Sequence, residues 1–201
     1  MEKKTKNSVF AKSAAKLLNN MINIKEQYKN VAIPGLKEKF GFKNQVLVPK
    51  ISKVVLNVGF GKHTKEKELI SNIEKSLEKI AGQKPMMSKA KKSISAFKIR
   101  EGMVIGSTVT LRGQRMNDFL NKLVNITFPR VRDFRGISDQ SIDNRGNITI
   151  GFKDQSCFPE IRAEDADNLF GLEVCIATSA RNREEGLELF KLLGFPFKKN
   201  Q

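Results

Sequence analysis

The residues with the clearest chemical potential lie in the stretch from Gly82 to Gly113. Between positions 84 and 101 this stretch sets six cations, Lys84, Lys89, Lys91, Lys92, Lys98 and Arg100, against a single acid, Glu101. Small residues separate the cations, so we expect a hairpin-like loop that cannot collapse on itself. Its charges can approach a polyphosphate, with Ile94 and Phe97 able to pack on a sugar or base. The pattern indicates an RNA-facing loop, and a solvated basic loop without a partner is the alternative.

The segment Gly59 to Thr64 invites comparison with a phosphate-binding loop, because a predicted strand precedes it and a predicted helix follows. The first glycine of that motif would fall at Leu56, and the residue after Lys62 is His63 rather than Ser or Thr. Both the backbone cradle and the magnesium ligand are therefore missing, which argues against nucleotide hydrolysis.

Metal, cofactor and catalytic chemistry find no support elsewhere. His63 is the only histidine, and Cys157 and Cys175 lie far apart without paired spacing, so a zinc site lacks ligands. We predict that both thiols are reduced core residues. No nucleophile and base are paired for catalysis. An acidic cluster is predicted to be a solvated helix start rather than a metal site; it comprises Glu164, Asp165 and Asp167.

Charge bounds the class of partner. The chain has 201 residues and a formal net charge of +16, so it should attract a polyanion, either a nucleic acid or an anionic membrane. No run of about 18 apolar residues occurs, which predicts no membrane span. Lys12 and Lys16 interrupt the first apolar segment, so no secretory signal is expected.

Two predicted strands present polar faces. In the run from Lys53 to Val58 the two-residue period places Val54, Leu56 and Val58 on a core face and Lys53, Val55 and Asn57 on an open face. Asn57 disfavours a strand interior, so it indicates either hydrogen bonding to a partner or a bulge before Gly59. The run from Met103 to Arg112 alternates in the same way. Its core residues are Ile105, Val109 and Leu111, and its open residues are Thr108, Thr110 and Arg112.

The remaining periodicity predicts helices and further strands around these two. Helices are expected over 65–81, capped by Gly82, over 114–128, ended by Pro129, and from a capping box at 182–185 to Gly194. The helix over 114–128 should cover the face of the sheet opposite the open one. Strands are expected over 146–152 and 172–179. We therefore predict an α+β fold, with a mostly antiparallel sheet, helices on one face and an open face for RNA.

The first 27 residues are basic and rich in small residues. They form either a short amphipathic helix or a segment that stays disordered until it meets RNA. A single domain is expected over residues 28–201.

Four dispersed motifs resemble the universal large-subunit ribosomal protein L five family, which binds 5S ribosomal RNA in the central protuberance. They occur in the family's order, at 77–93, 104–113, 129–136 and Phe158-Pro159-Glu160-Ile161. The resemblance implies a cytoplasmic, ribosome-bound, non-enzymatic protein without cofactors or a membrane partner. Besides 5S RNA, it implies contacts with 23S-type RNA and with neighbouring large-subunit proteins. A free RNA chaperone or translational regulator using the same surface is the alternative.

The resemblance also implies roles for particular residues. It places Asn57, Gln83 and Thr110 on 5S RNA, with the neighbouring Lys53, Thr108 and Arg112. It assigns a loop to the peptidyl-site transfer RNA, with Lys89, Lys91, Lys92, Ser93, Phe97, Lys98 and Arg100. An arginine-rich connection would face the small subunit and its protein S thirteen, through Arg130, Arg132, Arg135 and Arg145. In this connection, Ile142 to Gly146 departs from the family's usual Phe-Asp-Gly-Arg-Gly.

Overall fold

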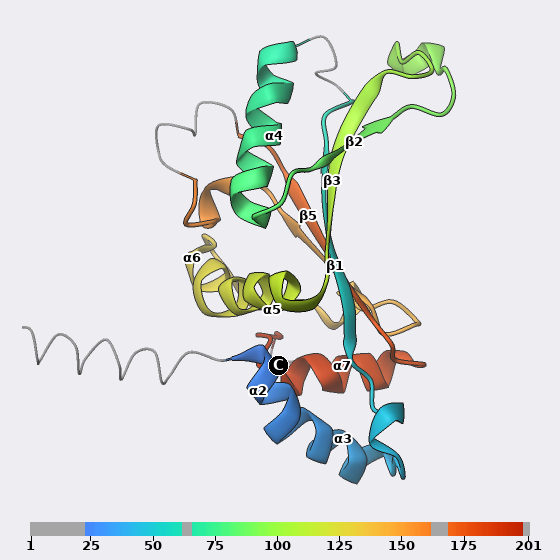
Figure 1. Cartoon of the computed structure of the whole chain (residues 1–201), viewed down its shortest axis with the longest axis vertical. Helices are drawn as coiled ribbons and strands as arrows, with labels where there is room; N and C mark the ends of the chain where they lie inside the picture. Colours follow the sequence, from blue (N-terminus) through green and yellow to red (C-terminus); the bar gives the residue numbers. More distant parts are fainter. Residues whose placement is uncertain (1–22, 62–65, 162–168, 199–201) are drawn as a thin grey trace, which may run out of the picture.

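A five-stranded sheet with strand order β2-β3-β1-β5-β4 organises the protein (Figure 1). The computed structural model describes residues 23–61, 66–161 and 169–198. Every strand pair is antiparallel, which confirms the predicted α+β class. The strands are β1 (Ile51–Gly59), β2 (Met86–Lys89), β3 (Val104–Leu111), β4 (Ile148–Phe152) and β5 (Leu172–Thr178).

The central strand β1 follows the predicted alternation. Val54, Leu56 and Val58 are completely buried, whereas Asn57 on the other face is exposed. The register between β1 and β3 is unbroken from Val54 to Gly59, so no bulge precedes Gly59. An irregularity against β5 occurs instead at the start of β1, between Ile51 and Lys53.

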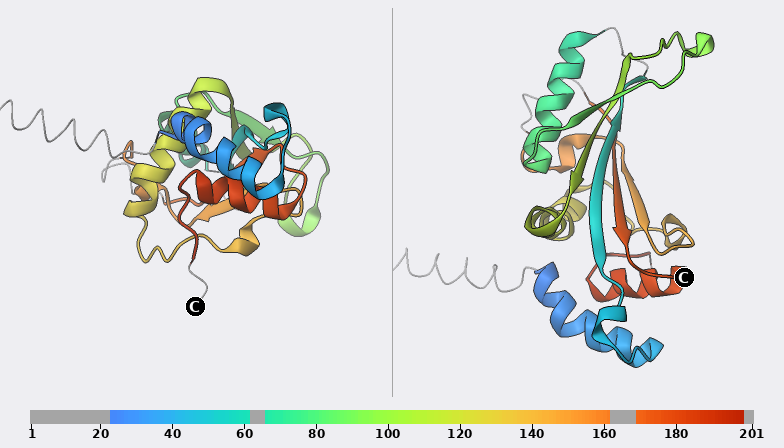
Figure 2. Two further views of the ribbon diagram at one scale, coloured as in Figure 1. Left: turned by 90° about the horizontal axis from the view of Figure 1, so that it is seen from below. Right: turned by 45° about the vertical axis from the view of Figure 1, so that its right-hand side comes forward.

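Helices α4 (Lys67–Ala81) and α5 (Gly113–Lys122) lie against one face of the sheet, as the right-hand view of Figure 2 shows. Ile73, Leu77 and Ile80 of α4 are buried, and Gly82 ends the helix in the left-handed region at φ 64°. The helix after β3 runs on through a π-helical turn, 123–127, and α6 (Phe128–Arg130). The predicted end at residue 128 is two residues short, because proline is tolerated within the first turn of α6.

A second group of helices packs at the lower end of the sheet. There α2 (Ile24–Gln27), a π-helical turn over 28–32 and α3 (Ile33–Phe40) lie against α7 (Arg183–Leu192). Ile24 is buried, and its N–H donates to Asn121 Oδ1 at 2.7 Å. The described fold thus begins before position 28, and residues 1–22 of the predicted extension lie outside the described residues.

The capping box predicted for α7 is only half formed. Glu185 accepts a hydrogen bond from the backbone N–H of Arg181 at 2.9 Å, one residue before the expected donor. Asn182 makes no side-chain capping bond. Beyond α7, Phe195 is buried and contacts Phe190 with ring centroids 5.1 Å apart, so the tail is held to the core.

Candidate nucleic-acid interface

The face of the sheet opposite α4 and α5 is built from rows of residues that cross several strands. Directly paired residues of antiparallel strands share a face, so the register defines these rows. The first row is Gly151, Glu173, Asn57, Thr108 and Met86, from β4 to β2. The second row is Thr149, Cys175, Val55 and Thr110. We call this surface the open face.

The open face brings together most of the residues predicted for 5S RNA. Asn57 and Thr108 are direct partners, and Thr110 lies two pairs further along, opposite Val55 in the second row. Lys53 continues the same face of β1. Arg112 follows β3 as the exposed N-cap residue of α5, so two cations flank the neutral side chains of Asn57, Thr108 and Thr110.

Gln83 lies away from these rows. It follows Gly82 in the connection between α4 and β2, and its amide oxygen accepts a hydrogen bond from Arg115 Nη1 of α5 at 3.4 Å. This contact belongs to the helical layer rather than to the open face.

The basic loop is an ordered extension of the β2–β3 hairpin. Ala90 N–H donates to the Met103 carbonyl at 2.8 Å, and Ile94 and Ile99 exchange backbone hydrogen bonds of 2.9 and 3.1 Å. Backbone pairing therefore closes the hairpin, while its cations stay exposed. Lys98 at the tip has a φ of 53°, and the neighbouring Phe97 is 71% exposed. In both figures the hairpin projects beyond the end of the sheet.

The four predicted arginines of the connection are exposed but belong to separate segments. Arg130 ends α6, Arg132 and Arg135 follow it, and Arg145 lies in a turn before β4. Asp143 organises that turn by accepting from the N–H groups of Arg145 and Asn147 at 2.9 and 2.8 Å. Burial acts to raise the pKa of Asp143, but the hydrogen bonds from Asn147 and Arg145 and the charge of Arg145 outweigh it and lower the pKa.

The two cysteines have different environments. Cys157 is buried, and burial raises the pKa of its thiol to about 11. Cys175 is a partly exposed residue of the open face, where its sulfur accepts a hydrogen bond from Thr149 Oγ1 at 3.6 Å. The prediction of two core thiols is therefore wrong for Cys175, since the alternation of β5 turns it away from the core.

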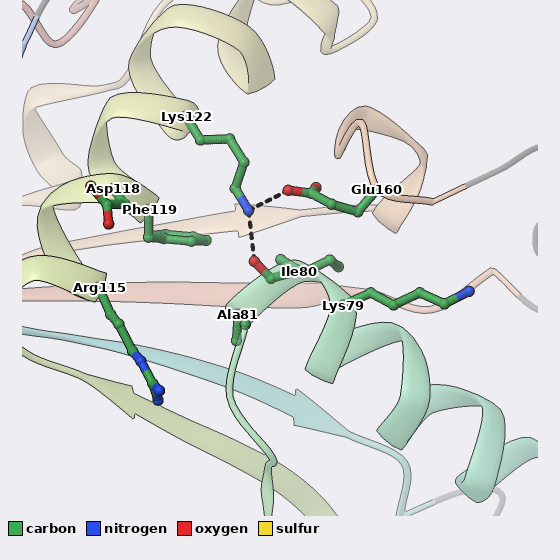
Figure 3. A pocket seen from close by; sticks show the side chains of 9 residues that line it. Lys79, Ile80, Ala81, Arg115, Asp118, Phe119, Lys122 and Glu160 are labelled. Carbon is green, nitrogen blue, oxygen red and sulfur yellow. Dashed lines mark hydrogen bonds and ion pairs between the residues drawn. The ribbon is translucent and has the colours of Figure 1, made fainter.

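A cleft of about 350 Å³ lies between the end of α4 and α5, but its central cation serves the fold (Figure 3). Lys122 Nζ donates to the Ile80 carbonyl at 2.6 Å and to Glu160 Oε1 at 2.5 Å. The same ammonium lies 5.4 Å from the centroid of the Phe119 ring. Lys122 thus joins the end of α4, α5 and the Phe-Pro-Glu segment.

We expect Lys122→Met to lower the free energy of unfolding by about 1 to 3 kcal/mol, because it strips partners from the Glu160 carboxylate and the Ile80 carbonyl. Chemical denaturation measures the change, and Lys75→Met, at an exposed position of α4, is the matched control. Adding Glu160→Gln should cost less in the Lys122→Met protein than in wild type. Equal costs would mean that the two residues are not coupled.

Metal binding and membrane insertion find no support in the part of the chain that the structure describes. No group of three or more His, Cys, Asp or Glu side chains there could hold a metal ion. No helix among the same residues is long and apolar enough to cross a membrane. The acidic cluster Glu164, Asp165 and Asp167 lies outside the described residues.

Comparison with known proteins decides the family. Residues 44–100 match the family described as "Ribosomal protein L5", and residues 104–197 match the model of the C-terminus of the same ribosomal family. The chain belongs to the ribosomal protein uL5 family. It is 52% identical over 178 residues to "Large ribosomal subunit protein uL5" of Desulforapulum autotrophicum, which covers 89% of this chain and 99% of that protein.

Other uL5 proteins are similar to a comparable degree. The one from Desulfatibacillum aliphaticivorans is 51% identical, with 89% of this chain and 100% of that protein covered. The one from Halothermothrix orenii is 51% identical, with 86% and 96% covered. Membership of uL5 confirms a large-subunit ribosomal protein, located on cytoplasmic ribosomes, in a structural rather than enzymatic family.

Sequence reasoning overlooked three members of the first row, Glu173, Gly151 and Met86. The alternation of Leu172, Val174 and Ile176 already turns Glu173 away from the core, so that signal was present. Which residues of other strands lie beside it depends on the strand order, which periodicity does not determine.

Proposed function

We propose that this uL5 protein binds 5S ribosomal RNA with its open face and so helps to attach that RNA to the large subunit. The observation that carries the proposal is the open face itself, which gathers Asn57, Thr108 and Thr110 within two adjacent rows. A helical layer on that face would have buried these groups, and α4 and α5 both lie on the other side.

The chemistry of the open face suits folded RNA better than generic phosphate. Asn and Thr side chains donate and accept hydrogen bonds with ribose hydroxyls and base edges, which carry the sequence and sugar information. Lys53 and Arg112 at the border supply the phosphate attraction, which is independent of sequence. We infer that selectivity comes from the centre of the open face and affinity from its border.

We expect Asn57→Ala and Thr110→Ala each to weaken 5S binding by roughly 1 to 3 kcal/mol, because each leaves a desolvated RNA group unpaired. The logarithmic salt dependence should stay unchanged, since no charge is lost. Gln83→Ala tests the third predicted residue, which lies off the rows. Asn117→Ala removes the same amide from α5 in the helical layer and is the matched control. Wild-type 5S affinity in both open-face variants, measured by a filter-binding titration, would contradict the proposal.

The hairpin tip and the arginine connection are proposed to reach two further partners. Exposed Phe97 and its neighbouring cations support contact of the hairpin with peptidyl-site transfer RNA. Phe97 would stack on a base, and the cations would contact phosphates. The exposed arginines of 130–145 support contact with the small subunit through its protein S thirteen. Contacts with 23S-type RNA and neighbouring large-subunit proteins complete the proposed assembly.

A further inference from the structure

Glu173 is the only acidic residue in the five strands that the structure describes. It lies half-buried on the open face, between Asn57 of β1 and Gly151 of β4. An acid at this position repels phosphate, so it opposes the attraction that the net charge of +16 provides. Generic attraction to RNA therefore gives no reason for a carboxylate there.

The Glu173 carboxylate retains most of its capacity to accept hydrogen bonds. Its Oε2 accepts from Asn57 Nδ2 at 3.4 Å, which is long for a hydrogen bond. It forms no ion pair with any other residue in the described ranges. A carboxylate offers about four lone-pair sites, so Glu173 presents an acceptor to whatever lies on the open face.

Two glycines border Glu173 and Asn57, Gly151 as the direct partner of Glu173 and Gly59 two residues after Asn57. Neither has a positive φ, and a Cβ at either position would meet no heavy atom within 4 Å. Neither backbone conformation nor packing within the described chain thus requires glycine, although glycine weakens a strand. A glycine inside a strand often marks the close approach of a ligand.

We propose that Glu173, Asn57, Gly151 and Gly59 form a subsite for a hydrogen-bond donor in the shallow minor groove of 5S RNA. The donor is a guanine N2 amino group or a ribose 2′-hydroxyl, the donors displayed by that groove. The glycines let the groove approach the sheet backbone, the carboxylate accepts the donor, and its charge keeps phosphates at the border. This subsite rests on the proposed binding of 5S RNA by the open face.

Glu173→Gln tests the carboxylate, because the subsite and simple electrostatics predict opposite changes in 5S affinity. Removal of a negative charge alone should strengthen binding to RNA. The subsite predicts roughly 10- to 100-fold weaker 5S binding, since a charge-assisted hydrogen bond is lost. Glu38→Gln, at an exposed position of α3, changes the net charge equally and should bind like wild type or slightly tighter. If Glu173→Gln binds as tightly as Glu38→Gln, or tighter, Glu173 is only a repulsive residue and the subsite is overturned.

Gly151→Val tests close approach from a different strand. Valine favours strands and its side chain enters open space, so the free energy of unfolding should not fall. Binding of 5S RNA should weaken at least about tenfold, because the added side chain holds the groove away from the sheet. Unchanged 5S affinity would overturn the close approach. If Asn57→Ala and Thr110→Ala weaken 5S binding but Glu173→Gln and Gly151→Val do not, only the subsite is contradicted. If none of the four variants weakens 5S binding, the proposed function is contradicted as well.

Interference mapping distinguishes the two donors. Pools of 5S transcripts, each sparsely substituted with inosine or with 2′-deoxynucleotides, are selected for binding to wild type and to Glu173→Gln. If inosine at a position weakens binding to wild type but not to Glu173→Gln, the donor is the guanine amino group at that position. If 2′-deoxy substitution has this effect, the donor is the ribose hydroxyl. The absence of any position whose interference depends on Glu173 would contradict a donor at the carboxylate.

Discussion

Gly186→Ala is expected to lower the free energy of unfolding by about 3 kcal/mol or more, which is at the upper end for overpacking a core. A Cβ at Gly186 would lie 2.4 Å from the Cα of Gly146 and 2.5 Å from its carbonyl oxygen. These are backbone atoms, so no rotamer change relieves the clash. Gly146 itself has a φ of 73°, and a Cβ at its position would lie 2.7 Å from the Cβ of Ala180, so the turn before β4 has little room to move.

Chemical denaturation of Gly186→Ala beside Gly151→Ala measures this effect with the same chemical change at both sites. Gly151 faces open space, so its variant should be as stable as wild type or slightly more stable. Similar stabilities for the two variants would mean that α7 can shift away from the β4 turn at little cost.

Replacement of four hairpin lysines, Lys89, Lys91, Lys92 and Lys98, by Gln should loosen peptidyl-site transfer RNA on assembled ribosomes and spare the isolated 5S complex. Each lost phosphate contact should flatten the logarithmic salt dependence of transfer RNA binding by up to about 0.7 to 0.9 units. The two effects separate because the hairpin projects away from the rows of the open face. Both equilibria are measured across a salt series.

The matched control replaces four lysines that lie in or next to the helices. Lys29, Lys37, Lys43 and Lys75 are exposed or half-buried cations of that part of the chain, and their replacement by Gln should leave the transfer RNA salt slope unchanged. A fall in 5S affinity as large as the fall in transfer RNA affinity would show that the hairpin belongs to the 5S site. An unchanged slope for both would show that its lysines only solvate the loop.

Periodicity predicted the elements that carry long, regular patterns. The alternation of β1 placed Val54, Leu56 and Val58 in the core, and the stripe of α4 placed Ile73 and Leu77 there. Both signals are strong because one face of each element is buried and the other is not. Gly82 also marks a helix end correctly, since it is in the left-handed region.

Features that depend on neighbours distant in the sequence escaped prediction. Met86 to Lys89 has no alternation, and it becomes a strand only because β3 offers a partner edge. The ordered hairpin likewise depends on backbone pairing that its composition does not indicate. Of the residues predicted for 5S RNA, Asn57, Thr108 and Thr110 follow from alternation, whereas Gln83 came from the family resemblance and lies off the rows.

Cys175 allows the most direct test of RNA docking on the open face. Its partly exposed thiol lies in the second row, between Val55 and Thr149, while Cys157 is buried with a pKa raised to about 11 and should react slowly. A reference thiol introduced by Glu38→Cys lies on exposed α3. The rates of alkylation of these thiols are followed by mass spectrometry as 5S RNA is added. We expect saturating 5S RNA to protect Cys175 and to leave the reference thiol reactive; a Cys175 rate that 5S RNA does not change would contradict docking on this face.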